Sequence, residues 1–354
     1  MKLKPLLQVA RKKNASDLHL VVSCPPLLRI DGTIQAEGTV PLSQDDIRDA
    51  FLQVTTPAQQ GRFDQEMELD FAYVLPGVGR LRCNACKQQG NISLAFRLLA
   101  PAVPTIEELE LSPQVRDLAS AQRGLIIVSG PTGSGKTTTL AAMVNHINQK
   151  QRRYIVTIED PIEYVHANIQ SALSQRELEA DTISFAQALK HVLRQDPDVI
   201  LVGEMRDLET AHSVLTVAET GHLVLSTGHA PSSAGCIDRV VDLFPPHERP
   251  QAAARLASVV LAVLCQTLVP RINGGRVAAV EVMLGVPAVK NLIREGKTFQ
   301  LPNLIRTSTQ AGMMTLDQAL VELYLKETIS WETVTTYCFS TDEVEKLVGE
   351  VRVR

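Results

Sequence analysis

The sequence predicts an α/β protein in which a small α+β domain precedes a larger domain built on a mostly parallel sheet. Three observations lead to this class. Short apolar and polar elements alternate over about the first 98 residues, prolines interrupt the next stretch, and beyond residue 113 apolar runs alternate with amphipathic helical patterns. Apolar runs separated by helices are typical of parallel strands covered on both faces. A chain of 354 residues is also long enough for two domains.

The first domain is expected over residues 1–98. An apolar stripe from Leu3 to Ala10 predicts a helix, and the alternation around Leu18 and Leu20 predicts a half-buried strand. Asp31-Gly32 lies between two short apolar runs and predicts a hairpin, because this pair tolerates positive φ. Further strands are expected at residues 80–82 and 93–98.

Residues 99–112, which contain Pro101 and Pro104, are the predicted linker, and residues 113–354 are the second domain. Thr105 and Glu108 predict a capping box for a short helix within the linker. The predicted strands of the second domain are Leu125–Val128, Tyr154–Ile158, Val199–Val202 and Leu223–Leu225, and the last 70 residues are predicted to be helical.

The longest apolar run, Leu256–Cys265, is about ten residues long, about half of what crosses a bilayer, and predicts a buried helix. Near the N-terminus the apolar pair Leu6-Leu7 is too short for a signal peptide, so we expect a cytoplasmic protein.

Composition argues against a protein that coats nucleic acid. The chain has 35 basic and 39 acidic residues and a net charge of −4, whereas phosphate neutralisation needs a surplus of Lys and Arg. Aromatic residues make up only 4% of the chain, so few side chains are available to stack on single-stranded bases. No nucleic-acid partner is expected.

A glycine-rich loop is the strongest motif. Gly130-Pro131-Thr132-Gly133-Ser134-Gly135-Lys136-Thr137 matches G-x-x-x-x-G-K-[ST], follows an apolar strand and begins an amphipathic helix. Such a loop turns backbone N–H groups toward phosphates, and the helix contributes its positive end. We therefore expect this loop and Thr138 to bind ATP, with Lys136 at the β- and γ-phosphates and the Thr137 hydroxyl as a Mg²⁺ ligand.

Two further strands end in carboxylates. Ile158 is followed by Glu159-Asp160-Pro161-Ile162-Glu163, and Val202 by Gly203-Glu204. An acid at the tip of a parallel strand faces the crevice in which ligands bind. The first group is a candidate to activate the attacking water, or else forms a solvated turn. Glu204 is a candidate partner of Mg²⁺, or else it forms a salt bridge with Arg206. Arg206 itself either pairs with Glu204 or reaches a phosphate of the nucleotide.

Two histidines and two cysteines have spacings that argue against a shared ligand site. His222 and His229 are spaced to lie at opposite ends of one strand, so both are not expected at one nucleotide. A histidine beside an apolar strand is more often a hydrogen-bonded core or rim residue. Cys83 and Cys86 have metal-like spacing, but no second pair completes a zinc site, so two ordinary thiols are expected.

Taken in order, these motifs resemble those of the type II secretion and type IV pilus ATPases. The loop at 130–137 resembles their Walker A motif, Thr157–Glu163 their aspartate box, Gly203–Asp207 their Walker B motif and Gly221–His229 their histidine box. Two further segments, Ala15–Leu20 and Ala288–Glu295, resemble signatures of the pilus retraction ATPases within this family. The resemblance covers nearly the whole chain.

The resemblance implies a PAS-like fold for residues 1–98 and a RecA-like P-loop fold for residues 113–354. It implies that Glu163 is the catalytic carboxylate, that Glu204 acts on the Mg²⁺ side, and that His222 and His229 belong to the site. It also implies that arginines complete the nucleotide site, some from the N-terminal domain in a ring. The corresponding residues here are Arg82, Arg97, Arg194 and Arg206.

The function implied by the resemblance is that of a homohexameric motor that hydrolyses ATP to retract a type IV pilus and so drives twitching motility. Its partners would be the pilus platform protein of the inner membrane and the pilus machinery. The protein would therefore work in the cytoplasm, in peripheral contact with the membrane complex at the pilus base.

This chain departs from the family pattern at two places. Thr227-Gly228-His229-Ala230 occupies the place of the usual Thr-Leu-His-Thr, and Val289-Lys290 that of Ile-Arg. Assembly and secretion ATPases of the family usually have a longer N-terminal region and a four-cysteine metal motif, which this sequence lacks. The alternatives are a pilus assembly or type II secretion ATPase of the same family, a non-motor accessory protein of that family, a RecA-type nucleic-acid motor and a scaffold with an inactive site.

Overall fold

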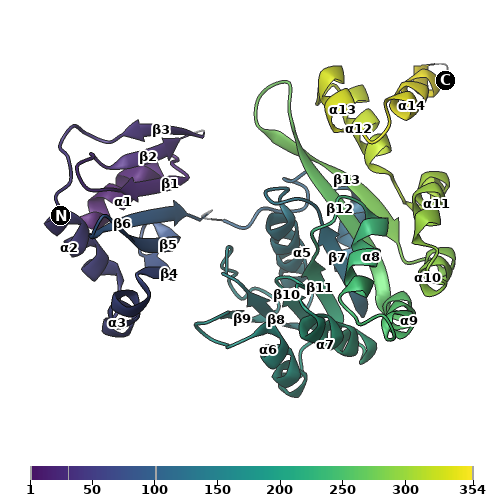
Figure 1. Cartoon of the computed structure of the whole chain (residues 1–354). Coiled ribbons are helices and arrows are strands. Elements are labelled where there is room, and N and C mark those ends of the chain that lie inside the picture. The colour runs from purple at the N-terminus through teal and green to yellow at the C-terminus, as the bar shows by residue number, and fades with distance from the viewer. Residues whose placement is uncertain (1, 31, 100–101, 353–354) are drawn as a thin grey trace. The chain divides into compact units, whose positions relative to one another are not determined.

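The computed structural model describes residues 2–30, 32–99 and 102–352. The chain forms two compact units, Met1–Ala102 and Val103–Arg354 (Figure 1). Asp31 of the expected hairpin turn and residues 100 and 101 of the expected linker lie outside the described residues. From the rest of that linker, Ile106 and Leu111 are buried in a core of the second unit.

An antiparallel sheet with strand order β3-β2-β1-β6-β5-β4 forms the first unit. Apolar side chains of the sheet and of three helices share one core, in which Leu7, Leu18, Phe63 and Phe96 are almost fully buried. The elements are α1 (Leu3–Lys12), β1 (Asp17–Leu20), β2 (Leu27–Ile30), β3 (Thr33–Ala36), α2 (Gln44–Val54), α3 (Pro57–Glu66), β4 (Glu68–Leu75), β5 (Gly79–Gln88) and β6 (Asn91–Leu98).

Cys83 and Cys86, both on β5, are free thiols, and Cys83 is buried in this core. Nowhere in the described ranges do three or more His, Cys, Asp or Glu side chains gather in a group that could hold a metal ion.

A mostly parallel sheet of order β13-β12-β7-β11-β10-β8-β9 organises the second unit, and only the β12–β13 pair is antiparallel. The expected α/β class is therefore confirmed. The strands are β7 (Gly124–Ser129), β8 (Tyr154–Glu159), β9 (Ala172–Glu177), β10 (Val199–Val202), β11 (Leu223–Thr227), β12 (Val260–Pro270) and β13 (Arg276–Leu284).

Helices cover both faces of this sheet (Figure 1). On β7, Leu125 and Ile127 face a core shared with α6–α11, while Ile126 and Val128 face a core shared with α4 and α5. Successive residues of a strand point to opposite faces of the sheet, so an unbroken apolar run places apolar side chains on both faces. These helices are α4 (Pro113–Ala119), α5 (Lys136–Lys150), α6 (Phe185–Val192), α7 (Leu208–Glu219), α8 (Ser233–Asp242), α9 (Arg249–Val259), α10 (Pro287–Arg294) and α11 (Leu301–Thr307).

The C-terminal helices pack on the far part of the β12–β13 pair, where Val269 and Val277 meet Leu320 and Val334. They are α12 (Leu316–Leu325), α13 (Trp331–Tyr337) and α14 (Thr341–Arg352), and short 3₁₀ turns lie at η1 (Leu193–Gln195), η2 (Thr298–Gln300) and η3 (Thr309–Ala311). Among the described residues, no helix is both long and apolar enough to pass through a bilayer.

Two local expectations are wrong. Leu256–Cys265 is not one helix, because α9 ends at Val259 and the rest of the run begins β12. This strand lies between β7 and β13 and is buried on both faces, and a short buried apolar run has the same pattern in a helix and in such a strand. The capping box of Thr105 and Glu108 does form, but the residues after it make a turn rather than a helix.

Candidate functional site

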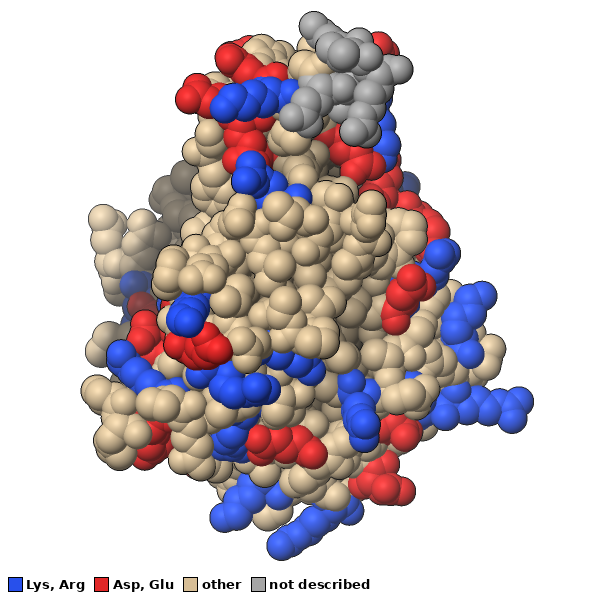
Figure 2. All heavy atoms as spheres, turned by 90° about the vertical axis from the view of Figure 1, so that its right-hand side faces the viewer, with Lys and Arg blue, Asp and Glu red and all other residues tan. Residues whose placement is uncertain are grey.

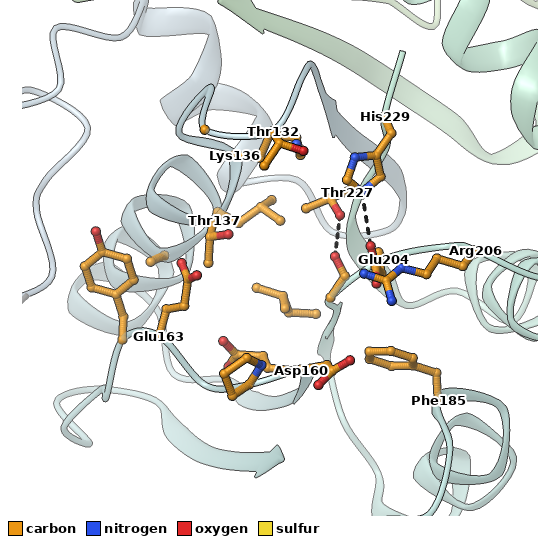
Figure 3. A pocket seen from close by; sticks show the side chains of 18 of the residues that line it. Thr132, Lys136, Thr137, Asp160, Glu163, Phe185, Glu204, Arg206, Thr227 and His229 are labelled. Carbon is orange, nitrogen blue, oxygen red and sulfur yellow. Dashed lines mark hydrogen bonds and ion pairs between the residues drawn. The ribbon is translucent and has the colours of Figure 1, made fainter. Parts of the chain in front are cut away.

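A pocket lies in the second unit where the carboxyl ends of four parallel strands meet (Figure 3). Ligands of open parallel sheets bind at this edge. The glycine-rich loop follows β7, the aspartate-box segment follows β8, Gly203-Glu204 follows β10 and His229 follows β11. The four motifs are far apart in sequence and are brought to one place by the parallel pairing.

Lys136 begins α5 and is held over the loop from which it comes. Its Nζ donates to the carbonyl oxygens of Gly130, at 2.9 Å, and Pro131, at 3.0 Å. An ammonium group has three donors, so one remains for a phosphate oxygen. Burial lowers the pKa of Lys136, and the charge of Glu204 opposes that shift. The nearby carboxylate thus helps to keep the ammonium charged.

Glu163 reaches the pocket from the loop after β8, on the side of Thr137 (Figure 3). The next residue fixes this loop, since the Tyr164 hydroxyl lies 3.0 Å from Thr138 Oγ1 on α5. Glu159 also lines the pocket, but its Oε1 accepts hydrogen bonds from Thr157 Oγ1 at 2.7 Å and Gln175 Nε2 at 3.2 Å. Glu159 is thus held in place by the sheet, which favours Glu163 as the acid that acts on a ligand.

Glu204 is buried and held from two sides. One carboxylate oxygen pairs with Arg206 and the other lies 3.0 Å from His229 Nε2. The Thr227 hydroxyl donates to the Gly203 carbonyl and so ties the end of β11 to the turn that carries Glu204. The salt bridge with Arg206, which the sequence offered as the alternative to a Mg²⁺ role, therefore forms, and both residues line the pocket.

Comparison with known proteins identifies the family of this chain. A family model described as type II/IV secretion system protein matches residues 93–279. The type IV pilus retraction ATPase PilT of Pseudomonas aeruginosa is 45% identical over 94% of this chain and 96% of its own length. The chain belongs to the type II/IV secretion system protein family. The resemblance seen in the motifs is thereby confirmed.

Two further relatives are similar over most of the chain. A twitching motility protein of Neisseria gonorrhoeae is 42% identical over 90% of this chain and 85% of its own. A crystal structure of the pilus retraction motor PilT with bound ADP superposes with a TM-score of 0.92 at 39% identity, covering 98% of this chain and 99% of that one. Members of this family are ATPases, and this chain is an ATPase of the family. Its α/β fold, a mostly parallel sheet in one unit and an antiparallel sheet in the N-terminal unit, is similar to that of the PilT structure.

The altered histidine box has a local packing reason. A Cβ atom at Gly228 would lie 3.0 Å from both Cys236 Sγ and Ser129 Oγ, which is too close unless those neighbours shift. At Ala230 the backbone provides the anchor, since its N–H donates to Ser129 Oγ at 2.9 Å and its carbonyl accepts from the same hydroxyl at 2.8 Å. His229 therefore stays beside Glu204 without the usual leucine and hydroxyl.

Two candidate residues lie elsewhere in the second unit. The pocket lining within the described chain includes neither Arg194 nor His222. Arg194 is exposed on η1, and His222 precedes β11 at the opposite end of that strand from His229. His222 Nδ1 lies 3.0 Å from Thr220 Oγ1 and 3.1 Å from the Val217 carbonyl oxygen, so the imidazole secures the end of α7.

Four charged residues form a row across neighbouring strands of the first unit. Arg29 pairs with Asp17, Asp17 with Arg97, and Arg97 with Arg82. Asp17 accepts a hydrogen bond from Arg97 Nε at 2.9 Å, and its other oxygen lies 3.7 Å from Arg29 Nε. Three guanidinium groups against one carboxylate give this row an excess of positive charge, which favours an anionic ligand.

The oxygen donors in the pocket fit Mg²⁺. The Thr137 hydroxyl and the Glu204 carboxylate line the same pocket, and both are hard ligands of the kind that Mg²⁺ prefers. A site with few protein ligands is usual for this ion, because water and substrate phosphates fill the remaining positions. The donor types of these two residues are therefore compatible with Mg²⁺.

His166 also lines the pocket, and burial lowers its pKa to about 4. Above the unfolded pKa of about 6.5 the imidazole is neutral in both states, and its burial does not oppose folding. As the pH falls from 6.5 toward 4, the unfolded state binds a proton that the folded state does not, so the free energy of unfolding decreases. We expect the melting temperature of the wild type to fall across this window more steeply than that of His166→Gln. Across this window the free energy of unfolding of the wild type should fall by roughly 2–3 kcal/mol more than that of His166→Gln.

Thermal unfolding at several pH values between 7.5 and 4 measures this effect. His247→Gln is the matched control, because the His247 side chain is 78% exposed, and its curve should run parallel to that of the wild type. The expectation is wrong if His166→Gln follows the wild-type curve at every pH.

Proposed function

We propose that this chain is the ATP-driven motor that retracts a type IV pilus. One observation supports this most: a phosphate-binding loop, Glu163 and Glu204 line one pocket in a chain that is 45% identical to PilT over nearly its whole length. In a motor of this kind, ATP hydrolysis opens and closes the pocket and the chain converts that motion into force.

The pocket residues divide the chemistry of hydrolysis between them. The loop from Gly130 to Thr138 holds the phosphates, with the Lys136 ammonium at the β- and γ-phosphates. Thr137 and Glu204 would hold Mg²⁺, which would supply positive charge against the phosphates. Glu163 accepts a proton from the attacking water.

Arginines complete the site in this proposal. Arg206 lines the pocket and forms an ion pair with Glu204. Arg82 and Arg97 would come from the N-terminal domain of a neighbouring copy in a homohexamer. There the row of four charged residues on the first unit would face the γ-phosphate. Arg194 would add positive charge at the same subunit boundary, while His222 would act only by holding α7.

The proposed partners are the platform protein of the inner membrane and the pilus machinery, contacted from the cytoplasm. An uncharged surface supports a protein contact: Figure 2 shows a broad area without charged side chains, and the stretch from residue 298 to 316 contains a single charge, Arg306. Within it Phe299 is 76% exposed. An area depleted of charge that carries an exposed aromatic side chain is typical of the centre of a protein–protein interface.

ATP hydrolysis by the purified chain separates this proposal from a nucleic-acid motor. We expect hydrolysis that depends on Lys136, is unaffected by DNA, and changes little between low and moderate salt. Nucleic-acid motors bind through phosphate contacts and lose affinity steeply with salt. A DNA-stimulated activity that salt abolishes would contradict the pilus motor and favour the alternative.

A further inference from the structure

Gln266 lies beneath the nucleotide-binding loop, on β12, and only 3% of it is exposed. Both ends of its carboxamide are engaged by the segment that follows β7. Nε2 donates to the carbonyl oxygen of Ser134 at 2.7 Å, and Oε1 accepts from Thr139 Oγ1 at 2.8 Å. One side chain from a different strand thus holds the loop and the first turn of α5 together.

The backbone of Gln266 also comes close to the loop. A Cβ atom at Gly130 would lie 2.3 Å from the Gln266 carbonyl oxygen, and one at Gly135 would lie 2.9 Å from Gln266 Nε2. Both glycines also have φ in the left-handed region, at 142° and 86°. The first and last glycines of the motif are therefore required by contact with this residue as well as by the turn.

The hydrogen bond to Ser134 has a consequence for the next residue. A peptide unit is planar and trans, so its C=O and N–H point in opposite directions. With the Ser134 carbonyl directed at Gln266, the N–H of Gly135 is directed away from β12. Gly135 precedes Lys136 at the start of α5, where backbone N–H groups bind phosphate.

We propose that Gln266 is a positioning residue for the nucleotide phosphates. Its carboxamide fixes the Ser134–Gly135 peptide so that the Gly135 N–H is oriented before the nucleotide arrives. The inference rests on the proposed nucleotide site and adds to it a residue from β12, a strand outside the four sequence motifs. Since β12 pairs with β13, the loop is tied directly to the strand pair that supports the C-terminal helices.

Binding of ADP tests the proposal without requiring hydrolysis or pili. Gln266→Met keeps the length of the side chain but removes the donor, and it leaves the buried Ser134 carbonyl unpaired. We expect the Kd for ADP to rise about tenfold, equivalent to about 1.4 kcal/mol. In ATP hydrolysis the KM should rise by a similar factor, while kcat at saturating ATP stays within about twofold, because ground-state and transition-state binding weaken together.

Three comparisons make the result specific. Gln251→Met changes an exposed glutamine on α9 and should leave the Kd unchanged. Thr139→Val removes only the bond to Oε1 and should weaken ADP binding less than Gln266→Met does. If Gln266→Met does not fold, Gln266→Asn is used instead, since its shorter amide cannot reach Ser134 and should weaken ADP binding in the same direction.

A folded Gln266 variant that binds ADP as the wild type does, with only a lower melting temperature, would overturn the positioning role. So would a Thr139→Val variant that weakens binding as much as Gln266→Met. Lys136→Ala separates this failure from failure of the proposed function. If Lys136→Ala also binds ADP normally, the nucleotide site itself is misplaced, whereas if it alone loses ADP, only the role of Gln266 is wrong.

Discussion

Replacement of Glu163 by Gln should lower ATP turnover by about 10²- to 10⁴-fold, the contribution of a positioned general base. Glutamine has the size of glutamate and still forms hydrogen bonds, but it does not accept the proton of the attacking water. The Kd for ADP should stay within about threefold of the wild-type value, because Glu163 is assigned to the attacking water, which takes no part in ADP binding. Steady-state hydrolysis and ADP binding, measured on the same preparation, check both parts.

Two other acids serve as controls for this substitution. Glu209→Gln alters an exposed acid at the start of α7 and should leave turnover unchanged. Glu159→Gln perturbs the hydrogen bonds to Thr157 and Gln175 and should chiefly lower the melting temperature. If Glu159→Gln reduces turnover more than Glu163→Gln does, the base is Glu159 and the assignment is wrong.

Replacement of Arg82 by Ala should reduce hydrolysis by about 10³- to 10⁵-fold if its guanidinium group stabilises charge at the γ-phosphate. The decisive measurement mixes Arg82→Ala subunits with Lys136→Ala subunits, each inactive alone. In a mixed ring, an intact pocket on one subunit meets an intact arginine on its neighbour, so part of the hydrolysis should return.

Arg48→Ala is the matched control, because Arg48 is an exposed arginine on α2 of the same unit. It should be active alone and should behave as wild type in mixtures. Absence of any rescue at all mixing ratios, in rings shown to contain both subunits, would mean that one chain makes the whole site.

The sequence predicted the pocket well where the chemistry is local. The loop at 130–137 is contiguous, and the strands before Lys136, Glu163 and Glu204 are apolar runs bounded by clear turns. Because the carboxyl ends of parallel strands share an edge, predicting the strands also predicted that these residues meet. The structure places Lys136, Thr137, Glu163, Glu204, Arg206 and His229 in one pocket.

Contacts between distant segments were not predictable in this way. Gln266 meets Ser134 across 132 positions, and Asp17 meets Arg97 across 80. No local pattern marks Gln266, which stands in an apolar strand that periodicity alone did not distinguish from a helix. The spacing of His222 and His229 did predict opposite strand ends, and the structure places them there.

Pilus retraction in living cells tests the central claim most directly. In a strain that lacks the gene, fluorescently labelled pili are followed during expression of either the wild-type chain or Glu163→Gln at equal protein level. We predict that the wild-type chain restores retraction and surface twitching, and that Glu163→Gln restores neither while pili accumulate. Retraction at the wild-type rate with Glu163→Gln would contradict a motor driven by hydrolysis in this pocket.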